Sequence, residues 1–233
     1  MDSIAANLQA VRARIARAAQ SARRNSTDIL LLAVSKTFPA GRIEEAYAAG
    51  QTAFGENHAQ EAVEKITVLA ALPLEWHFIG PIQGNKTRLI AQHFAWAHGV
   101  ERERIAGRLN AARAEGMPPL NVCIEVNVSG EPTKSGVAPG EEVKLADAIA
   151  RLPRLKLRGL MALPEPTADA ALQRRRFALL RELKEGLVAR GHALDTLSMG
   201  MSDDFEAAIL EGATIVRIGT AIFGERGRLT YAS

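Results

Sequence analysis

The chain has 233 residues, of which 47% are hydrophobic and 24% are charged, a composition typical of a globular protein with enough apolar material for a sizeable core. Its net charge is only +3 and the acidic residues are interspersed among the basic ones, so the sequence predicts no nucleic-acid partner. No apolar run is long enough to cross a membrane, and the one cysteine, Cys123, excludes an intrachain disulfide and fits a reducing compartment, so we expect a cytoplasmic protein without a membrane partner.

The first 24 residues predict an amphipathic helix. Apolar side chains recur three or four positions apart, at Ile4, Leu8, Val11 and Ile15, which is the spacing of one helix face. We therefore expect an extra helix, within 1–24, before the main body of the fold.

From residue 28 onwards, strand and helix patterns alternate. The first apolar run, Ile29 to Val34, has the length of a buried strand, and seven similar runs follow it. The predicted strands are 28–35, 52–55, 74–80, 94–100, 120–129, 155–163, 193–200 and 214–219. The predicted helices between them are 40–50, 58–72, 85–93, 101–116, 140–152, 169–191 and 203–212.

Eight strands that alternate with helices indicate a parallel sheet. At this length they fit a single α/β domain, a closed (β/α)8 TIM barrel, whose usual size is about 250 residues. We expect the barrel to span 28–224 and a tail to follow at 225–233. The alternative is an open doubly wound sheet, but no glycine-rich dinucleotide fingerprint follows the first strand.

Lys36 stands at the end of the first predicted strand, and the carboxyl ends of barrel strands carry the functional groups of such folds. Burial at this place favours the neutral amine, which is the form that attacks an aldehyde. The alternative is structural, with Lys36 reaching solvent at the rim or pairing with an acid such as Glu56.

The loops after the seventh and eighth strands are rich in glycine and hydroxyl groups. They read SMGMSDD and RIGTAIFG, and they contain Gly200, Ser202, Gly219 and Thr220. In barrels of this kind these two loops frequently bind a phosphate group. The alternative for Ser202 is a structural role as the N-cap of the helix 203–212.

A lysine on one side of the rim and a phosphate loop on the other suit two kinds of ligand. Pyridoxal 5'-phosphate has an aldehyde at one end and a phosphate at the other. A Schiff-base aldolase acting on a phosphorylated sugar would need the same two groups. Arg217, near the end of the eighth strand, favours the cofactor because a guanidinium can donate to a pyridine nitrogen. Its alternatives are a phosphate clamp or an ion pair with Glu125.

Six motifs are spread along nearly the whole chain, from the first strand to Gly224. They are LLAVSKTFP, FGENHAQEA, WHFIGPIQGNK, EVNVSGEPTKSGV, LRGLMALP and LSMGMSDDFEAAILEGATIVRIGTAIFG. Together they resemble the pyridoxal phosphate homeostasis proteins, the YggS/PROSC family. The resemblance implies an alanine racemase N-terminal-domain-like barrel (PLP fold type III) that stands alone.

The resemblance also implies how the cofactor is held. Lys36 is expected to carry pyridoxal phosphate as an internal aldimine, and Arg217 to face the pyridine nitrogen. Gly219 and Thr220 are expected to hold the phosphate together with a serine of the strand-seven loop.

Ser202 is favoured over Ser198 as that serine. Asn57, His77 and Met199 are expected to line the pocket. Lys134 matches a lysine that the family is thought to use in handling or sensing the cofactor, with a solvated loop lysine as the alternative. No metal site and no catalytic residue is predicted.

The resemblance favours a carrier over an enzyme. An arginine at the pyridine nitrogen weakens the ring as an electron sink, and racemases with this barrel take a second acid/base, a tyrosine, from an additional domain. Neither Tyr47 nor Tyr231 matches its position. We expect a protein, most simply a monomer, that buffers and delivers pyridoxal phosphate, maintains vitamin B6 and amino-acid homeostasis, and contacts PLP-dependent apoenzymes transiently. The alternatives are a weak amino-acid racemase and, third, the aldolase.

Overall fold

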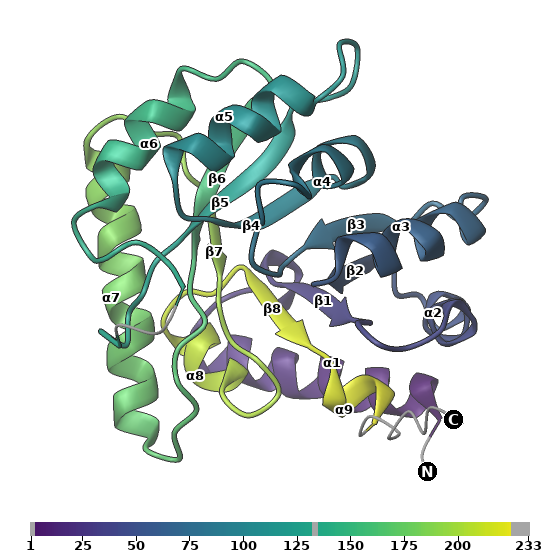
Figure 1. Ribbon diagram of the computed structural model, residues 1–233. Coiled ribbons are helices and arrows are strands. Elements are labelled where there is room, and N and C mark those ends of the chain that lie inside the picture. The colour runs from purple at the N-terminus through teal and green to yellow at the C-terminus, as the bar shows by residue number, and fades with distance from the viewer. Residues whose placement is uncertain (1–2, 132–134, 225–233) are drawn as a thin grey trace.

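The computed structural model describes residues 3–131 and 135–224. Within them, eight parallel strands form a closed barrel in chain order from β1 to β8, and β1 pairs with β8 (Figure 1). The predicted (β/α)8 barrel is confirmed. The open doubly wound alternative is wrong, because it would leave β1 and β8 unpaired with each other.

The elements follow the predicted order closely. The strands are β1 Leu30–Val34, β2 Ala53–Glu56, β3 Glu75–Phe78, β4 Trp96–Val100, β5 Leu120–Glu125, β6 Leu155–Met161, β7 Thr196–Ser198 and β8 Ile215–Ile218. The helices are α1 Ile4–Ser21, η1 Ser26–Asp28 (a 3-10 turn), α2 Ala40–Ala48, α3 Ala59–Val68, α4 Thr87–His93, α5 Glu103–Ala112, α6 Glu142–Ala150, α7 Ala170–Ala189, α8 Phe205–Leu210 and α9 Thr220–Phe223. Among the described residues, none of these helices combines the length and apolarity needed to span a membrane.

Apolar side chains pack in two places because successive strand residues face opposite sides of the sheet. The larger cluster lies between the strands and the surrounding helices and includes Phe54 and Val216. The smaller cluster fills the inside of the barrel. It consists of Leu32, Ala53, Trp96, Cys123, Met161 and Ile215.

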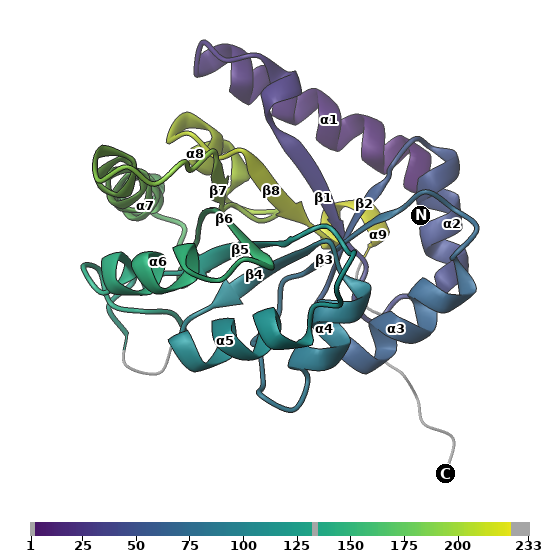
Figure 2. The ribbon, with the colours of Figure 1, turned by 90° about the horizontal axis from the view of Figure 1, so that it is seen from above.

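The N-terminal helix α1 forms as its apolar spacing predicts. The hydroxyl of Ser3 accepts a hydrogen bond from the backbone N–H of Ala6, which caps the helix. The buried face, which includes Ile4, Leu8 and Val11, contacts α2, α8 and α9. Figure 2 shows α1 along the outside of the barrel beside β1 and α2. The helix therefore covers the region where the first and last strands meet.

Two details near the C-terminus differ from the prediction. The strand β7 is only three residues long, whereas the sequence predicted 193–200. Met199 and Gly200 still share hydrogen bonds with β8, and the chain turns at Gly200, whose φ of +95° belongs to the left-handed region that glycine favours. The short helix α9 was not predicted, since four residues are too few to show a helical period.

Candidate functional site

A cavity of about 310 Å³ opens at the carboxyl ends of the strands. Small-molecule sites are concave, with apolar walls and a few convergent polar groups, and this volume lies at the small end of their range. The polar lining side chains are Lys36, Asn57, Ser202, Asp203, Arg217 and Thr220. The apolar walls come from Val34, Phe38, Ile79, Pro81, Leu163 and Met201.

Lys36 follows β1 directly, is half-buried, and lines this cavity. The acid considered as its partner, Glu56, is fully buried at the end of β2 and is engaged elsewhere. One carboxylate oxygen of Glu56 accepts hydrogen bonds from the hydroxyl of Ser35 (2.7 Å) and the ammonium of Lys65 (2.8 Å). Burial raises the pKa of Glu56, and the charge and hydrogen bond of Lys65 oppose that rise. Oε1 of Glu56 is thus engaged by Lys65 and Ser35, whereas its Oε2 is buried without a hydrogen-bond partner among the described residues.

The predicted phosphate loops converge on the cavity wall opposite β2. Ser202, Gly219 and Thr220 all line the cavity. A Cβ atom at Gly219 would lie 3.2 Å from the carbonyl oxygen of Val34, so the glycine lets the loop pass close to the end of β1. Thr220 begins α9, and the first N–H groups of a helix have no partner within the helix. Hydroxyls and backbone donors therefore gather where an anionic group would fit.

The structural alternative for Ser202 is not what the structure shows. The helix α8 begins at Phe205, and its N-cap position is held by Asp204. Asp204 accepts a hydrogen bond from the N–H of Met201 at 2.6 Å, which closes the turn before the helix. Ser202 is half-buried within that turn. A role as the helix cap therefore does not explain this serine.

Arg217 enters the barrel interior from β8 and is 3% exposed. Its guanidinium donates to the carbonyl of Ser198 (2.6 Å), to the hydroxyl of Ser198 (2.8 Å) and to the carbonyl of Ala162 (2.8 Å). Burial lowers the pKa of Arg217 to about 10, against the opposing charges of Glu125 and Asp204. The guanidinium stays cationic at neutral pH, and these bonds fix it at the floor of the cavity.

Two features of the wall suit a planar ligand that accepts and donates hydrogen bonds. The side-chain oxygen of Asn57 is buried and has no hydrogen-bond partner within the described protein, which is costly unless a ligand or water supplies one. A Cβ atom at Gly80 would lie 2.5 Å from the carbonyl oxygen of Asn57, so only glycine fits there. On the other side, Phe38 stacks on Phe223 with ring centroids 5.0 Å apart.

Not every predicted pocket residue lies on the cavity wall. His77 and Ser198 are buried in the barrel interior beneath the cavity, where they join the hydrogen bonds of Arg217. Met199 packs into the cluster between strands and helices, because it follows Ser198 and faces the other side of the sheet. Lys134 lies outside the described residues.

Nine residues that line the cavity were not predicted from the sequence, and they include Phe38, Gly80 and Leu163. Each of these three follows a predicted strand end or stands at it, so the rule that barrel sites lie at the carboxyl ends of strands was a sufficient signal for them. They were not predicted because apolar residues and glycines carry no reactive or charged group.

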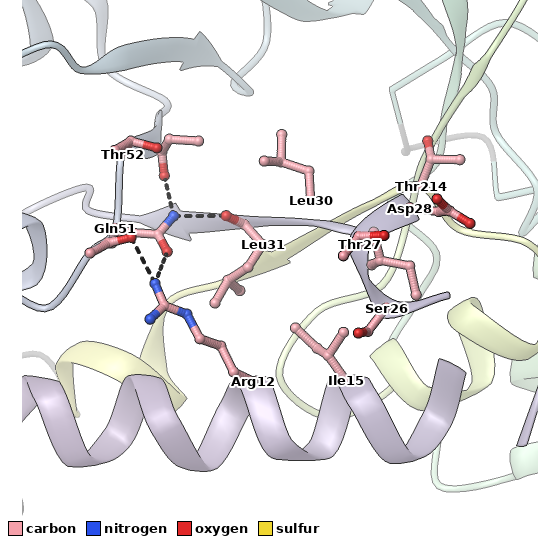
Figure 3. A pocket seen from close by; sticks show the side chains of 13 residues that line it. Arg12, Ile15, Ser26, Thr27, Asp28, Leu30, Leu31, Gln51, Thr52 and Thr214 are labelled. Atoms are coloured by element: carbon pink, nitrogen blue, oxygen red, sulfur yellow. Dashed lines mark hydrogen bonds between the residues drawn. The ribbon is translucent and has the colours of Figure 1, made fainter. Parts of the chain in front are cut away.

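A second, larger cavity of about 530 Å³ lies at the other end of the strands, between α1 and the starts of β1 and β2 (Figure 3). Two of its polar side chains, Arg12 and Gln51, are paired with backbone carbonyls. Arg12 donates to the carbonyls of Ala49 (3.1 Å) and Gly50 (2.9 Å). The side-chain amide of Gln51 donates to Leu31 (2.7 Å) and to Ala53 (2.8 Å). This cavity has volume but no unsatisfied group aimed into it.

The donor set at the carboxyl rim fits the cofactor that the sequence suggests. The amine of Lys36 suits an aldehyde, Arg217 suits a ring nitrogen, and Ser202 and Thr220 suit a phosphate. The unpartnered oxygen of Asn57 adds a place for a ligand group. Among the described residues, no cluster of side chains could hold a metal ion.

Comparisons with known proteins identify the family of the chain. Residues 6–227 match the family model described as "Alanine racemase, N-terminal domain". A protein of Pseudomonas aeruginosa named "Pyridoxal phosphate homeostasis protein" is 61% identical over 226 residues, which cover 97% of each chain. A protein of the same name from Escherichia coli is 53% identical over 232 residues, covering 97% of this chain and 98% of its own.

Two solved structures place the fold. The structure of PipY from Synechococcus elongatus, described as having PLP bound, is 38% identical with a TM-score of 0.79 and covers 90% of this chain and 100% of its own. Alanine racemase from Corynebacterium glutamicum is 17% identical with a TM-score of 0.68, covering 94% of this chain and 62% of its own. The second likeness is one of fold alone.

Proposed function

We propose that this protein binds and buffers pyridoxal phosphate, because the chain belongs to the pyridoxal phosphate homeostasis proteins, within the alanine racemase N-terminal domain family. One observation carries the proposal: Lys36 and Arg217 line a single cavity together with Ser202, Gly219 and Thr220 from the two loops rich in glycine and hydroxyl groups. PipY, a relative with the same fold, is described with PLP bound.

Each group of the cavity then has a role. When bound, the cofactor supplies an aldehyde that a primary amine can hold covalently. Lys36 is the amine at the rim, and Arg217 donates from the floor to the ring side. Gly219, Thr220 and Ser202 hold the phosphate end, and Asn57 offers its unpartnered oxygen to the ligand.

We propose a carrier without catalytic function. The close relatives are named for homeostasis, although more distant proteins of the same fold are enzymes. A racemase needs acid/base groups on both faces of its substrate, and the described cavity wall contains one lysine and no tyrosine or histidine. A permanently charged guanidinium at the ring nitrogen also disfavours protonation of that nitrogen. Weak racemase activity is the alternative, supported by the shared barrel.

The carrier role also concerns the partners of the protein and its location in the cell. We propose that one barrel, acting as a cytoplasmic monomer, exchanges the cofactor with PLP-dependent apoenzymes through the open mouth of the cavity. Lys134, which lies outside the described residues, stays a prediction for the handling of the cofactor.

The decisive experiment is the visible absorption spectrum of the purified protein after addition of pyridoxal phosphate. We expect a band from the lysine-bound cofactor that Lys36→Ala abolishes and that Lys156→Ala, at an exposed position of β6, retains. The absence of a band in the unmodified protein would overturn the proposal. Turnover of an amino acid at about 1 per second or faster would replace the carrier by the racemase.

A further inference from the structure

A chain of buried hydrogen bonds crosses the barrel from its N-terminal end to Arg217. Glu75 begins β3, and its carboxylate lies 2.8 Å from Nε2 of His77. Nδ1 of His77 lies 3.0 Å from Nε2 of His98 on β4. Nδ1 of His98 lies 2.8 Å from the hydroxyl of Ser198, which in turn accepts from Arg217 at 2.8 Å. His77, His98 and Ser198 are fully buried.

The direction of this chain follows from the chemistry of its ends. A carboxylate only accepts, so Nε2 of His77 carries the proton that it shares with Glu75. Burial lowers the pKa of His77 and lowers that of His98 further, so both rings are neutral and each has one donor and one acceptor. The Nδ1 atom of His77 must therefore accept from Nε2–H of His98.

The same reasoning continues to the cavity. Nδ1 of His98 accepts, so the hydroxyl of Ser198 donates to it. The oxygen of Ser198 then turns its lone pairs towards the guanidinium of Arg217, which only donates. One carboxylate thus fixes the orientation of four polar groups in series, and the last of them lines the proposed cofactor cavity.

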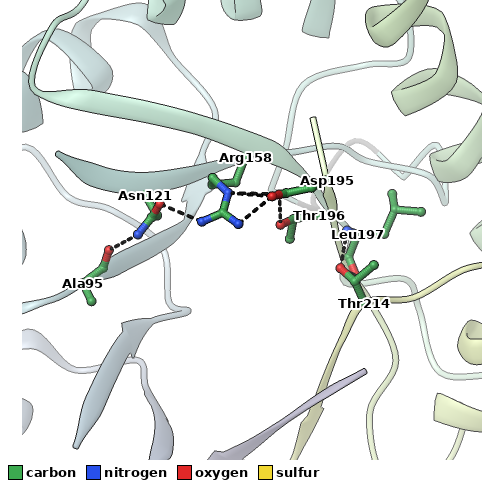
Figure 4. Close-up of polar contacts among 7 residues, drawn as sticks. All are labelled: Ala95, Asn121, Arg158, Asp195, Thr196, Leu197 and Thr214. Carbon is green, nitrogen blue, oxygen red and sulfur yellow. Dashed lines mark hydrogen bonds and ion pairs between the residues drawn. The ribbon is translucent and has the colours of Figure 1, made fainter. Parts of the chain in front are cut away.

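Packing also holds the N-terminal end of this hydrogen-bond chain in place. The ring of Trp96 stacks on His77, with centroids 5.3 Å apart and ring planes at 7°, and Arg158 lies 4.8 Å from the Trp96 centroid. Arg158 is itself bonded to Asp195 and Asn121 across the N-terminal end of the barrel (Figure 4). At this end of the hydrogen-bond chain, the side chain of Glu75 is 50% exposed and reaches solvent.

We propose that Glu75 is a positioning residue for Arg217, acting from the opposite end of the barrel through His77, His98 and Ser198. Its carboxylate aligns the donors so that Ser198 presents an acceptor to the guanidinium. The effect on a bound ligand rests on the proposed function, but the alignment itself is a property of the free protein.

The alignment is tested by ¹⁵N NMR of the ligand-free protein, because protonated and unprotonated ring nitrogens have well-separated shifts. We expect His77 and His98 both to carry their proton on Nε2. In Glu75→Ala, His98 should lose this single tautomer, and the guanidinium protons of Arg217 should lose protection from exchange. Glu75→Gln should restore both signals in large part, since its amide oxygen still accepts from His77.

The matched control is Glu45→Ala, which removes a carboxylate of similar exposure, 52%, paired with Arg42 on α2 and outside the chain. It should leave the His98 and Arg217 signals unchanged. A His98 proton on Nδ1 in the unmodified protein, or a Glu75→Ala spectrum equal to that of the control, would overturn the proposal.

The consequence for the ligand is measured by titration with pyridoxal phosphate. We expect Glu75→Ala to weaken binding about fivefold and to shift the absorption band, with partial rescue in Glu75→Gln and a change below about twofold in the control. Equal affinities of Glu75→Ala and the control would overturn the inference while leaving the binding function intact. Failure of the unmodified protein to bind would instead overturn the function and leave the tautomer result standing.

Discussion

The two ends of the barrel differ in how their polar groups are satisfied. At the N-terminal end, the larger cavity is lined by Arg12 and Gln51, which bond to backbone carbonyls, and Arg158 is closed by Asp195 (Figures 3 and 4). At the carboxyl end, the smaller cavity gathers a lysine, an arginine and hydroxyls around an unpartnered amide oxygen. Unmatched polar groups, more than volume, therefore distinguish the candidate site.

The carboxyl groups at the two ends of the barrel also differ in how they are satisfied. The prediction with the largest expected effect concerns a carboxyl group at the carboxyl end. Glu125, at the end of β5, is buried near Glu101 and Arg217. Burial, with the charge of Glu101, raises its pKa from an ordinary 4.5 to about 7, although Arg217 opposes the rise. The folded protein binds this proton more tightly than the unfolded chain does, so stability falls as pH rises from about 4.5 to about 7.

We expect Glu125→Gln to abolish this loss and to stabilise the protein by about 3 kcal/mol at pH 8, with little effect near pH 4.5. Urea unfolding at pH 4.5, 6 and 8 measures it. At the other end, burial alone would raise the pKa of Asp195, but the hydrogen bonds of Arg158 and Thr196 and the charge of Arg158 together lower it, so Asp195→Asn should destabilise the protein at neutral pH. The same sign for both variants at pH 8 would contradict the comparison.

Arg217→Met should nearly abolish function at the carboxyl end. It removes the donor at the cavity floor and leaves the carbonyls of Ser198 and Ala162 without their partner. We expect the affinity for pyridoxal phosphate to fall about 100-fold, measured by titration of the visible band. Unfolding in urea reports the separate cost to stability. Unchanged affinity in a folded variant would remove Arg217 from the site.

Arg158→Met breaks the network of the N-terminal end in Figure 4. The substitution removes three hydrogen bonds to Asp195, one to Asn121 and the contact over Trp96. We expect a loss of about 2 kcal/mol in the free energy of unfolding. Affinity for the cofactor should change less than about threefold. A large loss of affinity with intact stability would mean that Arg158, like Glu75, acts on the cofactor site from the N-terminal end.

Ser202→Ala is the smallest change. Because Ser202 is not the cap of α8, its loss should leave stability within about 0.5 kcal/mol, while one hydroxyl less for the phosphate weakens binding about fivefold. The comparison with Ser198→Ala decides which serine meets the phosphate: we expect the latter to act through Arg217 and to move the His98 signals, which Ser202→Ala leaves alone. Lower stability without weaker binding would restore a structural role for Ser202.

The sequence was sufficient for the architecture and for one edge of the site. Apolar runs of strand length, alternating with helical periods, predicted the barrel, and strand ends predicted that Lys36 and Thr220 lie at the same rim. The sequence pattern could not show how far below the rim of the barrel a side chain lies. His77 stands within a strand like other rim candidates, but the register of β3 against β4 sets its ring beside His98, below the cavity.

The sequence also could not show which side chains pair with each other. Glu56 was a reasonable partner for Lys36 by proximity to the rim, yet its buried carboxylate meets Lys65 from α3, nine residues away. Which lysine reaches a buried acid depends on how a helix lies against the sheet, and no periodicity encodes that. The chain from Glu75 to Arg217 was invisible for the same reason, because its members come from four different strands.

The closing pair of strands has a consequence for how the protein is made. Lys36 follows β1, Arg217 lies in β8, and α1 packs on α8 and α9. Contacts between such distant parts of a chain form slowly, because a long loop must close before they stabilise anything. During synthesis, the lysine leaves the ribosome long before the arginine and the phosphate loop exist. The order of translation therefore prevents a growing chain from assembling the cavity before its last strand has joined the barrel.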